Sequence, residues 1–406
     1  FELLQNPNNQ FKVNAAYRRL QILDSSLSQK PDNSLVSRFE YNFRLWKGFL
    51  YSNTFYEIGS GLESKKEFSY IKVAAGQGVY TYVDDYNKNG VQDLNEFEIA
   101  AFPDQAMYIK VYTPTNDYIK TFSNQFSQSL MIKPSALWAN EKGVKKFISR
   151  FANQLAYRVD KKTIEDDLLK AYNPFVSEKS DSTFDSTLVT LNSSFRNTLS
   201  VNQLSPTVGL DLTYQDVRNK VLLVNGFDSR QNIFKEARLR WNISQQLSWN
   251  FVYKDGHKIS KSEYFSSRDY SIIYYEVEPK FNYQPNTSFR VSISFKYTDK
   301  KNKTELGGQQ AVLQDYGLEV KYNVLQKGSL NLKGNFIQIK YTDPVKSSSL
   351  AFEMLDALKT GQNITWGISY QRNLSNNLQL SLTYDGRKSD GTKIIHTGGA
   401  QVRAYF

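Results

Sequence analysis

Cysteine is absent from this chain of 406 residues, and histidine occurs only twice, as His257 and His396. Without a thiol, the chain can form no disulfide, no thiolate metal site and no cysteine nucleophile. Neither histidine has a catalytic serine or carboxylate partner nearby in the sequence. The phosphate-binding G-x-x-x-x-G-K motif and the hydrolase G-x-S-x-G motif are also missing. We therefore expect the protein not to be an enzyme.

Long apolar runs are missing as well, because no stretch approaches the roughly 18 apolar residues of a transmembrane helix. The chain has no initiating methionine and no signal peptide, so we expect a mature protein or a fragment of a longer one. The 51 Lys and Arg residues outnumber the 40 Asp and Glu residues, but they form no long basic run. Nucleic acid is therefore not an expected partner.

Aromatic residues are abundant, at 14% of a chain whose mean hydropathy is −0.54. From about residue 126 onward, segments of roughly ten residues alternate apolar and polar side chains. In two clear segments the apolar residues are Ile273, Tyr275, Val277, Phe281 and Tyr283, and then Phe289, Val291, Ile293, Phe295 and Tyr297. This period of two predicts an antiparallel sheet with one apolar face.

A soluble β-sandwich would show the same alternation, but further features favour a membrane protein. Many apolar faces begin or end in Trp or Tyr, as the interfacial girdles of outer-membrane barrels do. The opposite faces carry full charges, which suit a water-filled or plugged lumen, and the last strand ends in an aromatic residue, Phe406. We therefore predict an all-β fold, a transmembrane antiparallel β-barrel of about 14–16 strands, with its apolar face against outer-membrane lipid.

Charged side chains on the predicted lumen face should compensate one another. The basic members are Arg238, Arg240, Lys280, Lys296 and Lys321, and the acidic members are Glu276, Glu278 and Glu319. Because both signs share one face, we expect ion pairs between them and at most a modest preference for anions in any pore.

Loop lengths predict the orientation, because outer-membrane barrels have short periplasmic turns and long extracellular loops. The connections at 283–287 and 373–377 are short, whereas those at 254–268 and 342–362 are long. We therefore expect the long loops outside the cell and the C-terminus in the periplasm. Apolar residues of a helix-like stretch in the last loop, 350–359, are expected to pack that loop.

Residues 59–122 lack the spanning pattern, and we expect them to form an extracellular insert. The chain then divides into the first barrel strands (1–58), the insert (59–122) and the main part of the barrel (123–406). Our tally of about fifteen spans is odd, whereas bacterial single-chain barrels normally have an even number. Either one strand is miscounted, or the chain is the C-terminal part of a longer polypeptide; the abrupt start at Phe1 favours the second interpretation.

A calcium-loop pattern lies within the insert, where residues 85–96 read D-x-N-x-N-G-x-x-D-x-x-E. Loop positions 1, 3, 5, 7, 9 and 12 are Asp85, Asn87, Asn89, the Val91 carbonyl, Asp93 and Glu96. Gly90 supplies the sharp turn at position 6. Such oxygen ligands suit Ca²⁺, although an Asn-, Asp- and Gly-rich surface turn has the same composition. We expect a structural calcium ion that orders the insert.

The segment 76–118, GQGVYTYVDDYNKNGVQDLNEFEIAAFPDQAMYIKVYTPTNDY, resembles a passage of large outer-membrane proteins of Bacteroidota. These include long cell-surface barrel proteins similar to the SprA-type translocon of type IX secretion. The similarity covers about a tenth of the chain closely. It implies an outer-membrane location, a cation loop in an extracellular insert, and partner lipoproteins or plug subunits.

The expected role is therefore a non-enzymatic outer-membrane component of a cell-surface transport, secretion or assembly complex. Two alternatives remain open from the sequence. One is a self-contained porin or receptor for a small solute, which the charged lumen supports. The other is a soluble, calcium-binding, β-rich adhesin, for which solubility without detergent would be the distinguishing observation.

Overall fold

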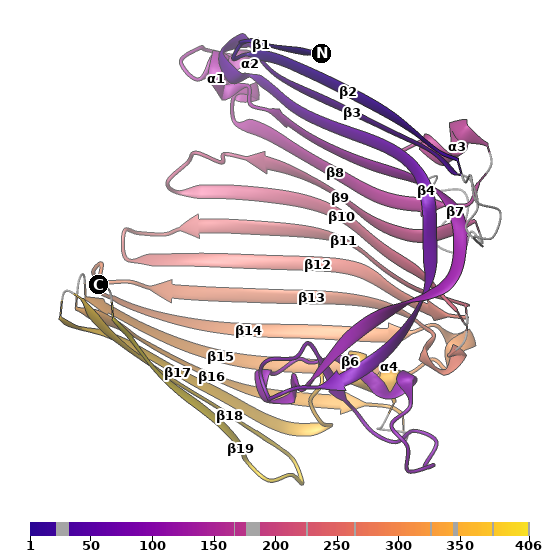
Figure 1. Ribbon diagram of the computed structural model, residues 1–406. Helices are drawn as coiled ribbons and strands as arrows, with labels where there is room; N and C mark the ends of the chain where they lie inside the picture. Colours follow the sequence, from indigo (N-terminus) through magenta and orange to yellow (C-terminus); the bar gives the residue numbers. More distant parts are fainter. Residues whose placement is uncertain are drawn as a thin grey trace.

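The computed structural model describes residues 1–21, 32–165, 167–175, 187–224, 226–263, 265–324, 327–343, 348–375 and 377–404. Within these ranges, nineteen strands form one antiparallel sheet (Figure 1). Three of these described strands have five residues or fewer, and sixteen have between 10 and 25. The predicted all-β antiparallel fold is confirmed. Phe406, the aromatic residue expected to end the last strand, lies outside the described residues.

The strands follow one another along the chain with few interruptions. They are β1 (Glu2–Asn6), β2 (Asn9–Leu20), β3 (Asp32–Leu45), β4 (Leu50–Lys72), β5 (Tyr80–Tyr82), β6 (Phe97–Ile99), β7 (Tyr108–Ile132), β8 (Phe151–Thr163), β9 (Leu188–Val201), β10 (Val208–Leu223), β11 (Gly226–Asn242), β12 (Leu247–Ser262), β13 (Tyr270–Tyr283), β14 (Phe289–Asn302), β15 (Gln310–Val324), β16 (Gly328–Tyr341), β17 (Gly361–Ser375), β18 (Leu378–Ser389) and β19 (Ile395–Ala404).

The helices are short and lie in the connections. They are α1 (Ser135–Trp138), α2 (Val144–Ile148), α3 (Leu168–Tyr172) and α4 (Ser349–Met354), with 3-10 helices η1 (Trp46–Gly48), η2 (Leu94–Glu96), η3 (Pro103–Gln105), η5 (Ser266–Arg268) and η6 (Thr304–Leu306). No helix in the described residues is long and apolar enough to cross a membrane.

Pairing between neighbours in the sequence builds almost the whole sheet. Each long strand from β7 to β19 pairs antiparallel with the next. The strands β1 to β4 pair in the same way, and β4 then pairs with β7. Figure 1 shows a curved sheet with β1–β3 and β17–β19 at its opposite ends.

The sheet has two chemically different faces, as the alternation predicts. We call outer the face that exposes apolar side chains to between 36% and 60%, among them Ile273, Phe281, Ile293, Tyr316, Leu318, Tyr322, Leu332, Ile364, Ile368 and Leu382. The intervening residues form the inner face, toward which the sheet curves (Figure 1). Inner residues include the buried Ser292, Thr298 and Lys300 of β14. The facing predicted for β13 and β14 from the sequence is confirmed.

One predicted connection is wrong in length. The stretch 254–268 was expected to be a long loop, but β12 continues to Ser262 and leaves only a short connection to β13. Strand pairing explains the difference, because β12 stays in register with both neighbours as far as Ser260 despite its polar sequence. His257 therefore lies in a strand, and not in a surface loop.

Candidate functional site

Ion pairs on the inner face form within single strands and between strands. Lys296 of β14 lies 2.9 Å from Glu276 of β13, and the Glu319 carboxylate of β15 lies 2.7 Å from the ammonium group of Lys321 and 3.5 Å from that of Lys280. These contacts confirm the predicted compensation for three lysines. The two arginines have other partners: Arg238 pairs with Glu236 at 2.9 Å, and Arg240 donates to the carbonyl oxygen of Ser205 at 2.9 Å.

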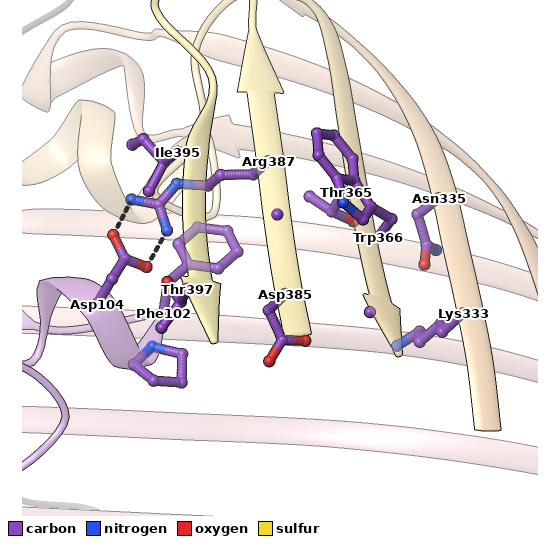
Figure 2. A pocket seen from close by; sticks show the side chains of 13 residues that line it. Phe102, Asp104, Lys333, Asn335, Thr365, Trp366, Asp385, Arg387, Ile395 and Thr397 are labelled. Atoms are coloured by element: carbon purple, nitrogen blue, oxygen red, sulfur yellow. Dashed lines mark hydrogen bonds and ion pairs between the residues drawn. The ribbon is translucent and has the colours of Figure 1, made fainter. Parts of the chain in front are cut away.

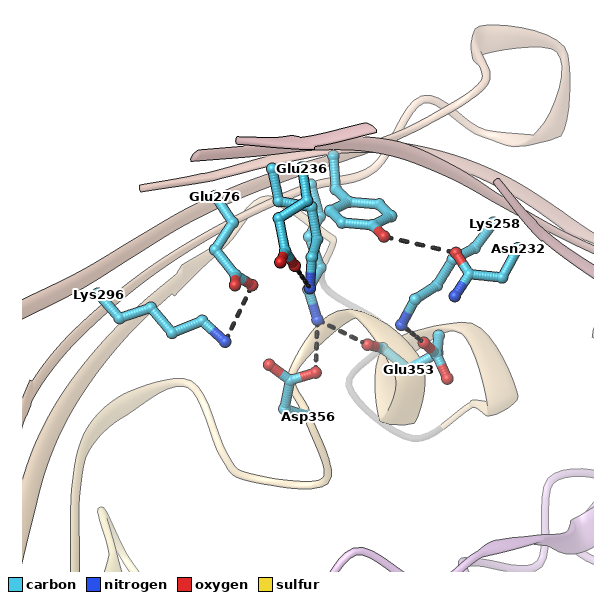
Figure 3. Close-up of polar contacts among 10 residues, drawn as sticks. Asn232, Glu236, Lys258, Glu276, Lys296, Glu353 and Asp356 are labelled. Carbon is cyan, nitrogen blue, oxygen red and sulfur yellow. Dashed lines mark hydrogen bonds and ion pairs between the residues drawn. The ribbon is translucent and has the colours of Figure 1, made fainter. Parts of the chain in front are cut away.

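The loop that carries α4 folds onto the inner face (Figure 3). Lys300 donates to the carbonyl oxygen of Glu353 at 3.0 Å and to the carboxylate of Asp356 at 2.6 Å, while Lys258 lies 2.5 Å from the Glu353 carboxylate. Next to these contacts, one apolar cluster joins the loop to β13, β15 and β16; its buried members are Tyr270, Ile272, Ala311, Leu313, Ile337, Ile339, Leu350, Ala351, Met354 and Leu355. The predicted loop packing by residues of 350–359 is confirmed.

The insert leaves the sheet where two pairings end. The register of β3 with β4 runs as far as Gly59, and that of β7 with β8 begins at Phe122. Between these points β4 and β7 pair with each other as a long ribbon, which crosses over the inner face (Figure 1). Beyond the ribbon, the short strands β5 and β6 pair around an aromatic core in which Phe97 stacks on Tyr70 at 4.1 Å.

Glu98 of β6 makes the first attachment of the insert to the sheet. Its carboxylate accepts from Arg268 of η5 at 2.8 Å and from Arg230 of β11 at 3.3 Å. The hydroxyl of Ser349, in α4, also donates to it. Both Glu98 and Arg268 are buried, so the pair is shielded from water. Removing one partner of such a buried pair strongly destabilises the folded protein, because the other charge is left buried without a partner.

Figure 2 shows the second attachment, between Asp104 and Arg387 of β18. The guanidinium donates to both carboxylate oxygens, at 2.7 Å for the longer bond. It also lies 4.3 Å from the ring centre of Phe102. A cavity of about 240 Å³ adjoins this contact and is bounded on the sheet side by residues such as Lys333 and Asp385. The two attachments hold the insert against distant parts of the inner face.

The calcium-loop segment closes around the carboxylate of Asp85. That carboxylate accepts from the backbone N–H groups of Asn89 at 3.2 Å and Gly90 at 2.8 Å. Gly90 has φ of +76°, a conformation that the sharp turn requires and that glycine adopts without strain. The side-chain oxygen of Asn89 in turn accepts from the N–H of Val91 at 2.7 Å.

The remaining predicted ligands are also bonded within the loop. Glu96 is fully buried, and its two oxygens accept from the N–H groups of Tyr86 and Asp93, each at 2.9 Å. One oxygen of Asp93 accepts from the side-chain amides of Asn87 at 2.7 Å and Asn89 at 2.8 Å. Among the described residues, no three His, Cys, Asp or Glu side chains gather as a ready metal group. The donors are all oxygen, which suits calcium, but their present bonds are to one another and to the backbone.

The two histidines are each bonded to a hydroxyl on a neighbouring strand. The His257 ring lies 2.8 Å from the Ser271 hydroxyl, and the His396 ring lies 2.8 Å from the Tyr384 hydroxyl. Within the described ranges, neither ring is hydrogen-bonded to a carboxylate. In that part of the chain, each pair therefore lacks the third group that orients a catalytic histidine.

Sequence reasoning missed the residues that dock the insert. Glu98 and its partner Arg230 are separated by 132 positions, and Asp104 and Arg387 by 283. No spacing motif spans such distances, so only the overall arrangement of the sheet brings these charges together. The one local signal is that Glu98 lies in an otherwise apolar stretch, Phe97–Ile99.

Comparisons with known proteins find similarity at the level of three-dimensional structure. No family model matches the sequence, and no curated protein sequence matches it. The ferric-catecholate import receptor Fiu of E. coli K12, in its open form, aligns with 99% of this chain and 71% of its own, at 9% identity and a TM-score of 0.37. The toluene transporter TodX of P. putida aligns with 98% and 87%, at 9% identity and a TM-score of 0.24.

Proposed function

We propose that the chain forms the wall of an outer-membrane transport pathway and has no enzymatic activity of its own. The observation that carries this proposal is the contrast between the two faces of the same strands. Apolar side chains are exposed on the outer face, whereas the inner face holds ion pairs such as Lys296 with Glu276. In water the outer face would be an unusually large apolar surface, but in a bilayer it is solvated by lipid.

The position of the insert supports a closed pathway. Glu98 and Asp104 attach it to the inner face, and the α4 loop covers the same face through Lys300. A charged lumen that holds folded polypeptide conducts small ions poorly until that polypeptide moves. The proposed resting state is therefore plugged, and transport requires the insert to be displaced.

Membrane extraction tests the location. In cells that make the chain, we expect it to remain in the outer-membrane fraction after washes with high salt and with carbonate, and to dissolve only in detergent. The reason is that the outer face buries its apolar area in lipid, and this contact is not electrostatic. Release by carbonate alone would contradict the proposal and favour the soluble adhesin.

We further propose that the chain is a component of a cell-surface secretion or assembly complex. The resemblance of residues 76–118 to a passage of large outer-membrane proteins of Bacteroidota, which include barrel proteins similar to the SprA-type translocon, supports it, with surface lipoproteins as partners. A porin or receptor for a small solute is the rival. Single-channel recordings with candidate solutes discriminate between them, because a solute pathway conducts and is blocked by its own solute.

The proposed orientation places the insert outside the cell and the short turns in the periplasm. The absence of cysteine makes this directly testable by single-cysteine labelling. With Lys88→Cys in the insert, we expect an impermeant maleimide to label intact cells. With Ser375→Cys, beside a short turn, labelling should require permeabilised cells. The reverse pattern would invert the orientation.

We also propose that a calcium ion binds within residues 85–96 and orders the insert. The oxygen-only donor set and the turn at Gly90 support it, and the buried carboxylate of Glu96 is costly without a cation nearby. The ligands would be Asp85, Asn87, Asn89, the Val91 carbonyl, Asp93 and Glu96. Binding would replace the amide contacts to Asp93 by contacts to the ion.

Glu96→Gln should weaken calcium binding, because it removes the carboxylate that would bind the ion through both of its oxygens at loop position 12. We expect chelation to speed proteolysis within 84–96 in the unmodified chain, and Glu96→Gln to show that faster cleavage with calcium present. The heat-resistant gel mobility of the whole protein should not change. Asp84→Asn is the matched control, since Asp84 precedes the ligand pattern. Equal cleavage with and without calcium would rule out the ion.

A further inference from the structure

A cavity of about 430 Å³ lies where the ribbon of the insert meets the sheet. The ribbon contributes Tyr70 and Lys110, and the sheet contributes Asn192, Asn219 and Arg230. Its volume lies within the range of pockets that hold small molecules. The cavity is separate from the calcium-loop segment and from the cavity beside Arg387, and it joins two parts of the chain that are distant in sequence.

Lys110 presents an ammonium group to this cavity. It lies directly across from Tyr70 in the ribbon, and its Nζ is 3.8 Å from the ring centre of Phe68 and 5.3 Å from that of Tyr112. In the described part of the chain it makes no hydrogen bond or ion pair. Burial lowers the pKa of Lys110 to about 8. Ring faces satisfy a cation only in part, so the site favours an anion.

Basic residues outnumber acidic ones in the lining of the cavity. Among the described residues, five lysines and arginines line it, together with one carboxylate, that of Asp228; the five are Lys66, Lys110, Lys220, Arg230 and Arg268. Arg230 and Arg268 share the carboxylate of Glu98, and Lys66 pairs with Glu63 at 3.3 Å. Even with these two carboxylates included, the positive charges remain in excess. A concave site with this balance attracts negatively charged ligands.

Neutral polar groups stand beside the charges. Asn192 of β9, Asn219 of β10 and Arg230 of β11 lie in register, so their side chains form one row across three strands. Side-chain amides both donate and accept, which is the chemistry that a hydroxyl group requires. Tyrosines 70, 80 and 112 also line the cavity and add rings and hydroxyls.

We propose that this cavity binds a small acidic sugar. Its acid group lies against Lys110, and its hydroxyls bond to Asn192, Asn219 and Asp228. An anion without hydroxyls would leave the amide row unused, and a neutral sugar would leave Lys110 without an anion in direct contact, since Asp228 lines the cavity but forms no ion pair with it among the described residues. The site thus requires both properties in one ligand.

Calorimetric titration of the detergent-solubilised chain with D-glucuronate tests the proposal, with D-glucose and inorganic phosphate as comparison ligands. We expect glucuronate to bind, glucose not to bind measurably, and phosphate to bind at least about tenfold more weakly. Lys110→Met should weaken glucuronate binding at least about tenfold, and Asn219→Ala should weaken it without affecting phosphate. Lys72→Met, an exposed lysine at the end of the same ribbon, should bind as the unmodified chain does.

Lys110→Arg distinguishes loss of the positive charge from a folding defect caused by substitution at this position. It keeps the charge and should keep most of the affinity for glucuronate. If both Lys110 variants lose binding, or if glucuronate does not bind the unmodified chain, the proposal is overturned. Equal affinity for phosphate and glucuronate, unchanged by Asn219→Ala, would reduce the site to a simple anion site and overturn the assignment of a sugar.

Discussion

Ile293→Arg should destabilise the folded protein in lipid vesicles by about 2–4 kcal/mol, whereas Ser294→Arg should cost much less. Ile293 lies in the middle of β14 on the outer face and is 60% exposed, so a charge there would enter the hydrocarbon layer. Ser294 belongs to the inner face, opposite Lys280 of β13. Unfolding by urea in vesicles, followed by tryptophan fluorescence, measures both changes.

A matched apolar substitution separates charge from packing at this site. Ile293→Leu should leave the free energy of unfolding nearly unchanged, because the side chain still contacts lipid. Equal destabilisation by Ile293→Arg and Ser294→Arg would show that the two faces are assigned wrongly. A larger effect at Ser294 would do so as well, and the membrane proposal would then lose its main support.

Glu98→Ala should detach the insert at its first attachment and leave the sheet intact. Removing this carboxylate leaves Arg268, which is buried, without its partner at 2.8 Å. The loss of one partner of a buried pair typically costs roughly 3–5 kcal/mol. If cleavage follows the population of the open form, trypsin should cut at Lys88 at least about a hundredfold faster.

The same variant should change conduction, because a detached insert uncovers the inner face. We expect planar bilayers with Glu98→Ala to show more frequent openings than those with the unmodified chain. Glu305→Ala is the control, since Glu305 forms an exposed pair with Lys303 in the connection between β14 and β15. Fast cleavage without new openings would mean that the insert does not obstruct the pathway. Unchanged cleavage would mean that Glu98 does not hold it.

The strands of the sheet could be predicted because their signal is local. Side chains of a strand alternate between faces, so Ile293 and Ser294 are assigned to opposite faces by two adjacent positions in the sequence. The same local rule led to the three lysines of the inner face that pair with Glu276 and Glu319. It also predicted about 14–16 strands, and the described part of the chain has sixteen long ones.

The rule fails where pairing, and not side-chain pattern, extends a strand. The polar stretch around His257 has no clear alternation and was predicted to be a loop, but the backbone of β12 continues because both neighbouring strands offer partners. Every non-proline residue can form backbone hydrogen bonds whatever its side chain, so the end of such a strand cannot be predicted from the side-chain pattern. Errors of this kind do not arise in the alternating segments of β13 and β14, where apolar contact and pairing agree.

Local patterns in the chain were enough to assign the two faces of the sheet and to find the calcium-loop segment, since both depend on residues within a dozen positions of one another. The place of the insert required the folded molecule, because Glu98 and Asp104 meet arginines that are 132 and 283 positions away. So did the cavity in which Lys110 meets a row of amides from β9 and β10. Charge attraction and burial depend on distance in space and not on distance along the chain. Residues that form such contacts therefore have no characteristic spacing in the sequence from which the contacts could be predicted.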